Sequence, residues 1–141
     1  PIVGMIQRGG AVKANVVDNV KMRTLESMII ENVKIGSNLF TDEFLSYSKI
    51  GKLFNHQAVR HSRGEYVKGE AHSNNAESFW ALFKRGHYGT YHYMSKKHLQ
   101  KYVDEFVYRF NGRTLDLNSI FSDSLLKVSG SKQLSYNILT Q

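Results

Sequence analysis

One segment of this chain, residues 72–86, restricts most strongly how the rest can fold. Its apolar side chains recur at the spacing of one face of a helix, and that face has to pack on a core. These side chains are Ala76, Phe79, Leu82 and Phe83. Glu77 and Lys84 lie two turns apart on another face of the same helix. The segment therefore predicts a helix with one buried face and one face that carries both a carboxylate and an ammonium group.

A second carboxylate, Asp42, stands at the end of a short apolar run, and 34 residues separate it from Glu77. The apolar run predicts a buried strand that Asp42 ends, and open α/β sheets place functional side chains at the ends of their strands. Carboxylates that converge can hold Mg²⁺ or Mn²⁺, and two such ions about 3.5–4 Å apart activate the attacking oxygen and stabilise the leaving oxygen in phosphodiester chemistry. The alternatives are that Asp42 caps a helix beginning near Phe44 and that Glu77 is only solvated.

Length and composition restrict the class of protein. The 141 residues predict one domain, residues 1–128, followed by a polar tail, residues 129–141. A net charge of +7 favours a polyanionic partner such as nucleic acid, and the absence of cysteine excludes disulfides and thiolate zinc sites. Because no apolar run approaches the roughly 20 residues of a membrane span and no signal peptide is visible, we expect a cytoplasmic protein without membrane contact.

The first half of the chain alternates strand and helix patterns. Two β-branched runs, 2–7 and 11–17, flank a Gly-Gly pair and predict a hairpin. A helix with Thr24 as its N-cap and Gly36 at its end should follow. The remaining predicted elements are a strand at 38–41, a helix at 44–50 that Gly51 breaks, a strand at 57–59 and an exposed loop at 61–70.

The second half is predicted to be helical. Ser73 or Asn74 can cap the helix at 72–86 and Gly86 can end it. Ser95 should cap the most regular helix, which Gly112 ends. Its apolar stripe consists of Leu99, Tyr102, Val103, Phe106, Val107 and Phe110. One more helix, 115–128, completes a predicted α/β fold in which helices flank a sheet.

Basic and polar side chains around the predicted helix at 72–86 are candidate DNA contacts, although a solvated surface is the alternative for each of them. They are Arg63, Lys68, His72, Asn74, Lys84, Arg85 and Lys97. The aromatic, His-rich segment 87–93 either stacks on bases or forms a packed corner between two helices. The six histidines show no pair at the spacing of a helical zinc site.

Several separate segments resemble the ISXO-like insertion-sequence transposases, in the same order along the chain. The resemblance covers about residues 2–113. The segments are the Gly9-Gly10 hairpin, Thr41–Glu43, His61–Tyr66, His72–Gly86, Gly89–His92, Lys97–Tyr102, Asp104–Phe106 and Arg109–Asn111.

The resemblance implies a ribonuclease-H-like catalytic domain of the DDE type, with a mixed sheet flanked by helices. Asp42 and Glu77 would be its second and third acidic residues and the ligands of two Mg²⁺ or Mn²⁺ ions, and Lys84 would be the lysine that follows the glutamate. Such enzymes bind double-stranded DNA at the ends of their element, cleave one strand and join the 3′-hydroxyl to target DNA. We also expect a homo-oligomer on DNA.

One departure from the family pattern concerns the first aspartate, which belongs on a strand ahead of the hairpin. No acidic residue precedes Asp18, and Asp18 lies at the wrong end of the second hairpin strand. The expectation is therefore an excerpt or a truncated, inactive copy that lacks the first strand, and little strand transfer from these residues alone. The alternative functions are another ribonuclease-H-like nuclease, such as a resolvase, and a catalytically inactive DNA-binding remnant.

Overall fold

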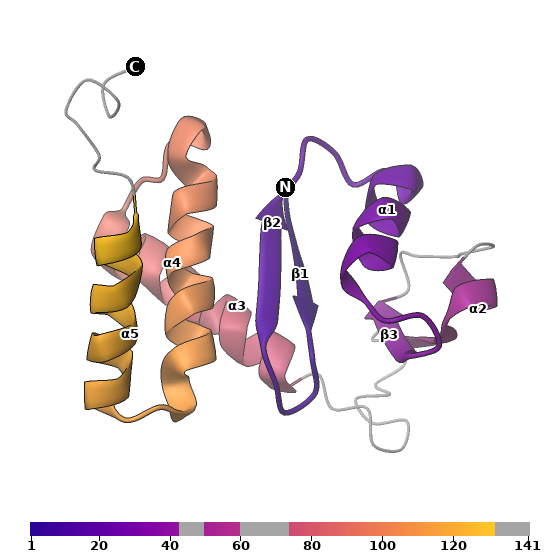
Figure 1. The fold of residues 1–141 in the computed structure, drawn as a ribbon. Helices are drawn as coiled ribbons and strands as arrows, with labels where there is room; N and C mark the ends of the chain where they lie inside the picture. The colour runs from indigo at the N-terminus through magenta and orange to yellow at the C-terminus, as the bar shows by residue number, and fades with distance from the viewer. Residues whose placement is uncertain (43–49, 60–73, 132–141) are drawn as a thin grey trace.

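The computed structural model describes residues 1–42, 50–59 and 74–131 (Figure 1). In chain order the described strands and longer helices are β1 (Ile2–Ile6), β2 (Val12–Val16), α1 (Met22–Asn32), β3 (Asn38–Asp42), α2 (Ile50–Leu53), β4 (Asn55–Val59), α3 (Asn74–Gly86), α4 (Leu99–Asn111) and α5 (Leu117–Gly130). The predicted loop at 61–70 and most of the predicted helix at 44–50 lie outside the described residues. The prediction of a mixed α/β protein is confirmed.

The predicted hairpin is present. β1 and β2 pair antiparallel, from Ile2 opposite Val16 to Ile6 opposite Val12. Gly9 has φ +64°, a backbone conformation that glycine adopts without a steric penalty, and it lets the chain reverse between the two strands. α3 and α4 pack against this hairpin, and α1 lies on the other side of it (Figure 1).

The second pair of strands, β3 and β4, is parallel, from Asn38 opposite Asn55 to Asp42 opposite Val59. The described strands thus form two separate two-stranded sheets, whereas the prediction was one sheet. The expectation that Asp42 ends a buried strand is also wrong, because Phe40 remains 40% exposed. Among the described strands β3 has a neighbour on one edge only, so β3 is incompletely covered. The Arg8 guanidinium, in the β1–β2 turn, lies 5.4 Å from the centre of the Phe40 ring.

The larger core joins α3 and α4 to the hairpin. Phe79 and Val103 are fully buried and Phe106 is 2% exposed. Val12 and Ala14 of β2 are buried in the same cluster. The predicted apolar faces of α3 and α4 are therefore confirmed. A smaller cluster beside the second sheet consists of Ile29, Ile50 and Phe54.

Two amide side chains of α4 close the outer edge of β2. Asn111 Oδ1 accepts a hydrogen bond from the Val12 N–H at 2.7 Å, and Asn111 Nδ2 donates to the Val12 carbonyl at 2.9 Å. Gln100 Oε1 accepts from the Val16 N–H at 2.7 Å. An unpaired strand edge exposes backbone donors and acceptors to wrong partners. Here the helix supplies the bonds that a neighbouring strand would otherwise make.

Replacing Asn111 by leucine should destabilise the fold by about 2 kcal/mol, because the Val12 N–H and C=O would lose their partners in a half-buried site. Urea denaturation followed by circular dichroism measures this change. Replacing Asn118, which is exposed on α5, by leucine is the control and should change stability by less than about 0.5 kcal/mol. Equal effects of the two substitutions would contradict the role of Asn111.

Three predicted helix boundaries in the first half were wrong. Thr24 lies inside α1 and its hydroxyl donates to Asn19 Oδ1, while Lys21 is the N-cap residue. Asn19 Oδ1 also accepts from the Lys21 N–H, so a side chain ahead of the helix organises its start. Gly36 lies beyond the end of α1, in a turn with φ +84°. Gly51 does not break a helix, because it lies within α2.

One boundary in the second half also differs from prediction. Ser95 precedes a single 3-10 turn, η3 (Lys96–His98), and makes no side-chain capping bond; α4 itself begins at Leu99. Gly86 is the last residue of α3, as predicted, and the chain continues directly into one turn of π-helix, η2 (His87–Tyr91). Gly112 is the C-cap of α4, as predicted, and begins another 3-10 turn, η4 (Gly112–Thr114).

Candidate active site

The two predicted catalytic acids stand at the ends of two elements. Asp42 is the last residue of β3, in parallel register with Val59 of β4. The placement of the Asp42 side chain lies outside the described structure. Glu77 lies in the first turn of α3, and its side chain is exposed. Strand end and helix start are therefore as predicted, and the meeting of the two side chains stays a prediction.

The exposed face of α3 presents a carboxylate at one end and cations at the other. Lys84 and Arg85 lie in the last turn and both are exposed. With a rise of 1.5 Å per residue, Lys84 lies about 10 Å along the axis from Glu77. Phe79 and Trp80 fix the rotation of the helix, because Phe79 is fully buried and the Trp80 ring lies against Gly4 of β1. The buried face thus keeps Glu77 and Lys84 toward solvent.

Among the other predicted DNA contacts, the structure describes the side chain of Lys97 only. Lys97 is exposed on η3, shortly after the turn that follows α3. Asn74 is the first residue of α3, but its side chain is not described. Arg63, Lys68 and His72 lie outside the described residues.

The aromatic segment after α3 separates into inward and outward members. Tyr91 packs against the rings of Tyr102 and Phe106 and donates its hydroxyl proton to Glu105. That hydrogen bond, with a smaller contribution from burial, raises the pKa of Tyr91 above its ordinary value. Tyr91 is therefore part of the packed corner between α3 and α4.

Tyr88 and Tyr93, in contrast, point outward and are 72% and 75% exposed. Along the chain Tyr88 follows Arg85 by three residues, and Tyr93 precedes Lys96 by three. Exposed aromatic rings next to basic side chains are typical of surfaces on which bases stack. The packed corner is therefore confirmed for Tyr91, while base stacking by Tyr88 and Tyr93 stays a prediction.

The donor chemistry of the predicted site fits a hard divalent ion. Carboxylate oxygens are the ligands that Mg²⁺ and Mn²⁺ prefer, and Glu77 is accessible to one. In the described part of the chain no group of three or more His, Cys, Asp or Glu side chains is arranged to hold a metal. Within the same residues no helix is both long and apolar enough to cross a bilayer.

Comparison with known families decides the relationship. The sequence pattern of the ISXO2-like transposase domain matches residues 1–111, which include β1 to α4 and both candidate acids. The chain belongs to this transposase family. An "Uncharacterized transposase-like protein" of Haemophilus influenzae is 31% identical over 115 residues, which are 81% of this chain and 92% of that protein. No solved structure matches the chain.

Sequence reasoning missed residues that position the helices around the candidate site. Gly86 allows the Phe106 ring to approach the backbone of α3, since a Cβ atom at Gly86 would lie 2.0 Å from Phe106 Cζ. The two amides that hold α4 to β2, Gln100 and Asn111, are eleven residues apart and so lie on one face of the helix. The spacing of Gln100 and Asn111 could have indicated from the sequence that both amides lie on one face of α4. The need for glycine at position 86 could not, because it arises from contact with Phe106, which is distant in sequence.

Proposed function

We propose that these residues form the catalytic core of a DNA transposase with a ribonuclease-H-like arrangement, which cleaves one strand at the element end and joins the 3′-hydroxyl to target DNA. The observation that carries the proposal is positional. In a chain of this family, one acid ends a parallel strand and the other occupies the exposed first turn of the helix that packs on the neighbouring sheet.

Asp42 and Glu77 would hold two Mg²⁺ or Mn²⁺ ions, which supply Lewis-acid stabilisation to the attacking and leaving oxygens when bound. The remaining work falls to the protein. The buried face of α3 orients Glu77, because Phe79 and Trp80 cannot rotate out of the core. Lys84, on the same exposed face, would contact a phosphate next to the reacting one.

The partner of this site would be double-stranded DNA, from the element end and from the target. Lys84, Arg85 and Lys97 provide exposed positive charge on one stretch of chain, from the end of α3 to η3. Such contacts position the phosphate backbone and carry no base specificity. We propose that the transposase acts on DNA as a homo-oligomer.

Salt dependence of DNA affinity tests the proposed contacts. Each of Lys84→Ala and Lys97→Ala should reduce the slope of log K against log salt by about 1, because one phosphate contact is lost. Fluorescence anisotropy with a labelled duplex measures the slope. Lys127→Ala is the control, because Lys127 Nζ is bound to Asp123 on α5 at 2.6 Å. Wild-type protein that fails to bind duplex at low salt would contradict the proposed function.

A further inference from the structure

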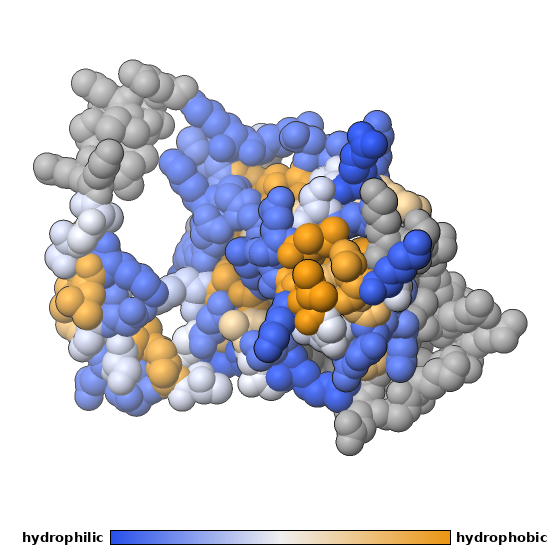
Figure 2. Space-filling model, turned by 45° about the vertical axis from the view of Figure 1, so that its right-hand side comes forward, coloured by the Kyte–Doolittle hydropathy of each residue, from blue (hydrophilic) through white to orange (hydrophobic). Residues whose placement is uncertain are grey.

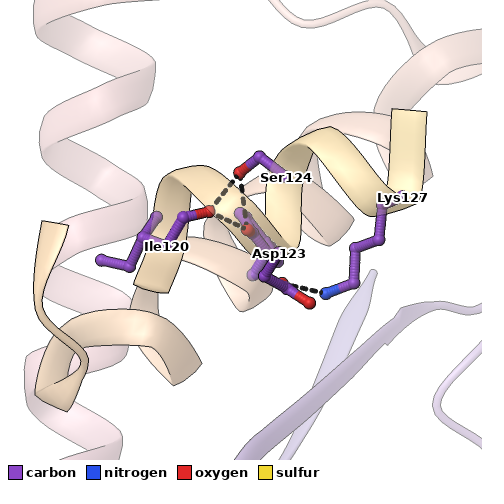
Figure 3. A network of polar contacts seen from close by, with 5 residues as sticks. Ile120, Asp123, Ser124 and Lys127 are labelled. Atoms are coloured by element: carbon purple, nitrogen blue, oxygen red, sulfur yellow. Dashed lines mark hydrogen bonds and ion pairs between the residues drawn. The ribbon is translucent and has the colours of Figure 1, made fainter. Parts of the chain in front are cut away.

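α5 turns a polar side toward the rest of the protein. Its contacts with α4 converge on Tyr108, whose hydroxyl lies 2.7 Å from Ser124 Oγ and donates to the Ile120 carbonyl at 3.3 Å. The Lys127 ammonium lies 4.4 Å from the centre of the Tyr108 ring and is bound to Asp123 (Figure 3). The hydrogen bond from Lys127 lowers the pKa of Asp123, so the pair stays ionised at neutral pH.

An apolar stripe on α5 is left in solvent. Leu117, Phe121, Leu125 and Val128 are 84%, 63%, 53% and 71% exposed. At 100° per residue the four side chains lie within an arc of about 80°, roughly 100° around the helix from the side that faces α4. Figure 2 shows hydrophobic residues on the surface of this helix, at the left of the view. A contiguous apolar stripe of this kind marks an interaction site.

Two properties distinguish α5 from the rest of the chain. The match to the transposase domain ends at residue 111, so α5 lies beyond the part of the chain that the family pattern accounts for. With its N-cap residue, α5 carries two carboxylates, Asp116 and Asp123, and one ammonium, Lys127, which is a net charge of −1 in a chain of +7. Two copies that meet at α5 therefore avoid the repulsion that their basic surfaces would cause elsewhere.

We infer that the stripe of Leu117, Phe121, Leu125 and Val128 is a self-association surface, on which α5 of a second copy of this chain packs antiparallel. The spacing is self-complementary, because Leu117 and Leu125 lie four residues on either side of Phe121. With Phe121 near a two-fold axis, Leu117 of each copy meets Leu125 of the other, as an isologous interface requires. The inference depends on α5 alone and not on the proposed chemistry.

The area of the stripe agrees with a weak dimer. From the exposed fractions, the four side chains offer roughly 500 Å² per copy, so a pair would bury about 1,000 Å², which is the lower limit of a specific interface. Antiparallel packing also sets the two helix dipoles in opposite directions, which is the favourable arrangement. We therefore expect dimerisation in the micromolar range, strengthened where DNA holds two copies together.

Cysteine cross-linking in the full 141-residue chain tests the geometry, because the natural sequence contains no cysteine. Phe121→Cys should form a disulfide-linked dimer under mild oxidation, because the two cysteines at position 121, one from each copy, would lie next to each other at the two-fold axis. Leu126→Cys is the matched control: Leu126 is 72% exposed on the same helix but points away from the stripe. Cross-linking of Leu126→Cys as fast as Phe121→Cys would overturn the inference.

Sedimentation velocity gives an independent readout. Phe121→Ser should raise the dimer dissociation constant at least about tenfold, whereas Leu126→Ser should leave it unchanged within about twofold. A wild-type chain that stays monomeric at about 100 μM would overturn the inference, because the expected dissociation constant is micromolar. Loss of thermal stability in Phe121→Ser without any dependence on protein concentration would also overturn it, since that result means that the stripe is covered within one chain.

Discussion

Replacing Glu77 by glutamine is expected to lower metal-dependent DNA cleavage at least a thousandfold, measured in a transposition-competent protein that contains these residues. Glutamine keeps the size and the helical preference of glutamate but loses the charge that a divalent ion requires. Because Glu77 is exposed and lies outside the core, the fold should be preserved. DNA affinity without metal should remain within about threefold of wild type, since the phosphate contacts come from other residues.

Glu31→Gln is the matched control for this substitution. Glu31 is exposed near the end of α1, a helix that carries neither predicted acid, and its replacement should leave cleavage unchanged. Cleavage by Glu77→Gln at a rate similar to wild type would remove Glu77 from the active site.

Replacing Gly86 by alanine should destabilise the chain by about 3 kcal/mol and lower Tm by roughly 10 °C. The new Cβ atom would lie 2.0 Å from Cζ and 2.5 Å from Cε1 of the Phe106 ring. Phe106 is 2% exposed and is in contact with Phe83 and Tyr91, so the ring has little room to move. This clash outweighs the gain of about 1 kcal/mol in helix propensity that alanine ordinarily brings.

Gly89→Ala provides the control for Gly86→Ala. Gly89 lies three residues further along, in η2, and a Cβ atom built there has nothing within 4 Å. Its substitution should change stability by less than about 1 kcal/mol in either direction. If thermal denaturation shows equal losses for the two substitutions, the close approach of Phe106 to α3 is not the reason for glycine at position 86.

The elements that could be predicted from the sequence are those that short-range patterns determine. The β-branched runs around Gly9 and Gly10 predict the hairpin, and the periodicity of Phe79 with its neighbours predicts α3. The apolar stripe of α4 was identified in the same way, and the side chains at its centre, Val103 and Phe106, are buried. In each case side chains close in sequence determine both the element and the face that is buried.

Contacts between residues distant in sequence could not be predicted. Asn111 binds Val12 across 99 residues, and the approach of Phe106 to Gly86 depends on how two helices cross. The described strands form two separate pairs, and Phe40 is exposed. Both features depend on which strands lie next to each other, and that is again a contact between distant parts of the chain. For the candidate site, the positions of Asp42 and Glu77 on their elements were predicted correctly, while their convergence depends on such a distant contact.

Paramagnetic broadening by Mn²⁺ tests that convergence directly. In an NMR spectrum of the assigned 141-residue chain, substoichiometric Mn²⁺ should broaden the backbone amides around Asp42 and those around Glu77 together, and Glu77→Gln should weaken both effects. Broadening at only one of the two segments, or at neither, would show that the two acids do not share a metal ion and would contradict the proposed active site.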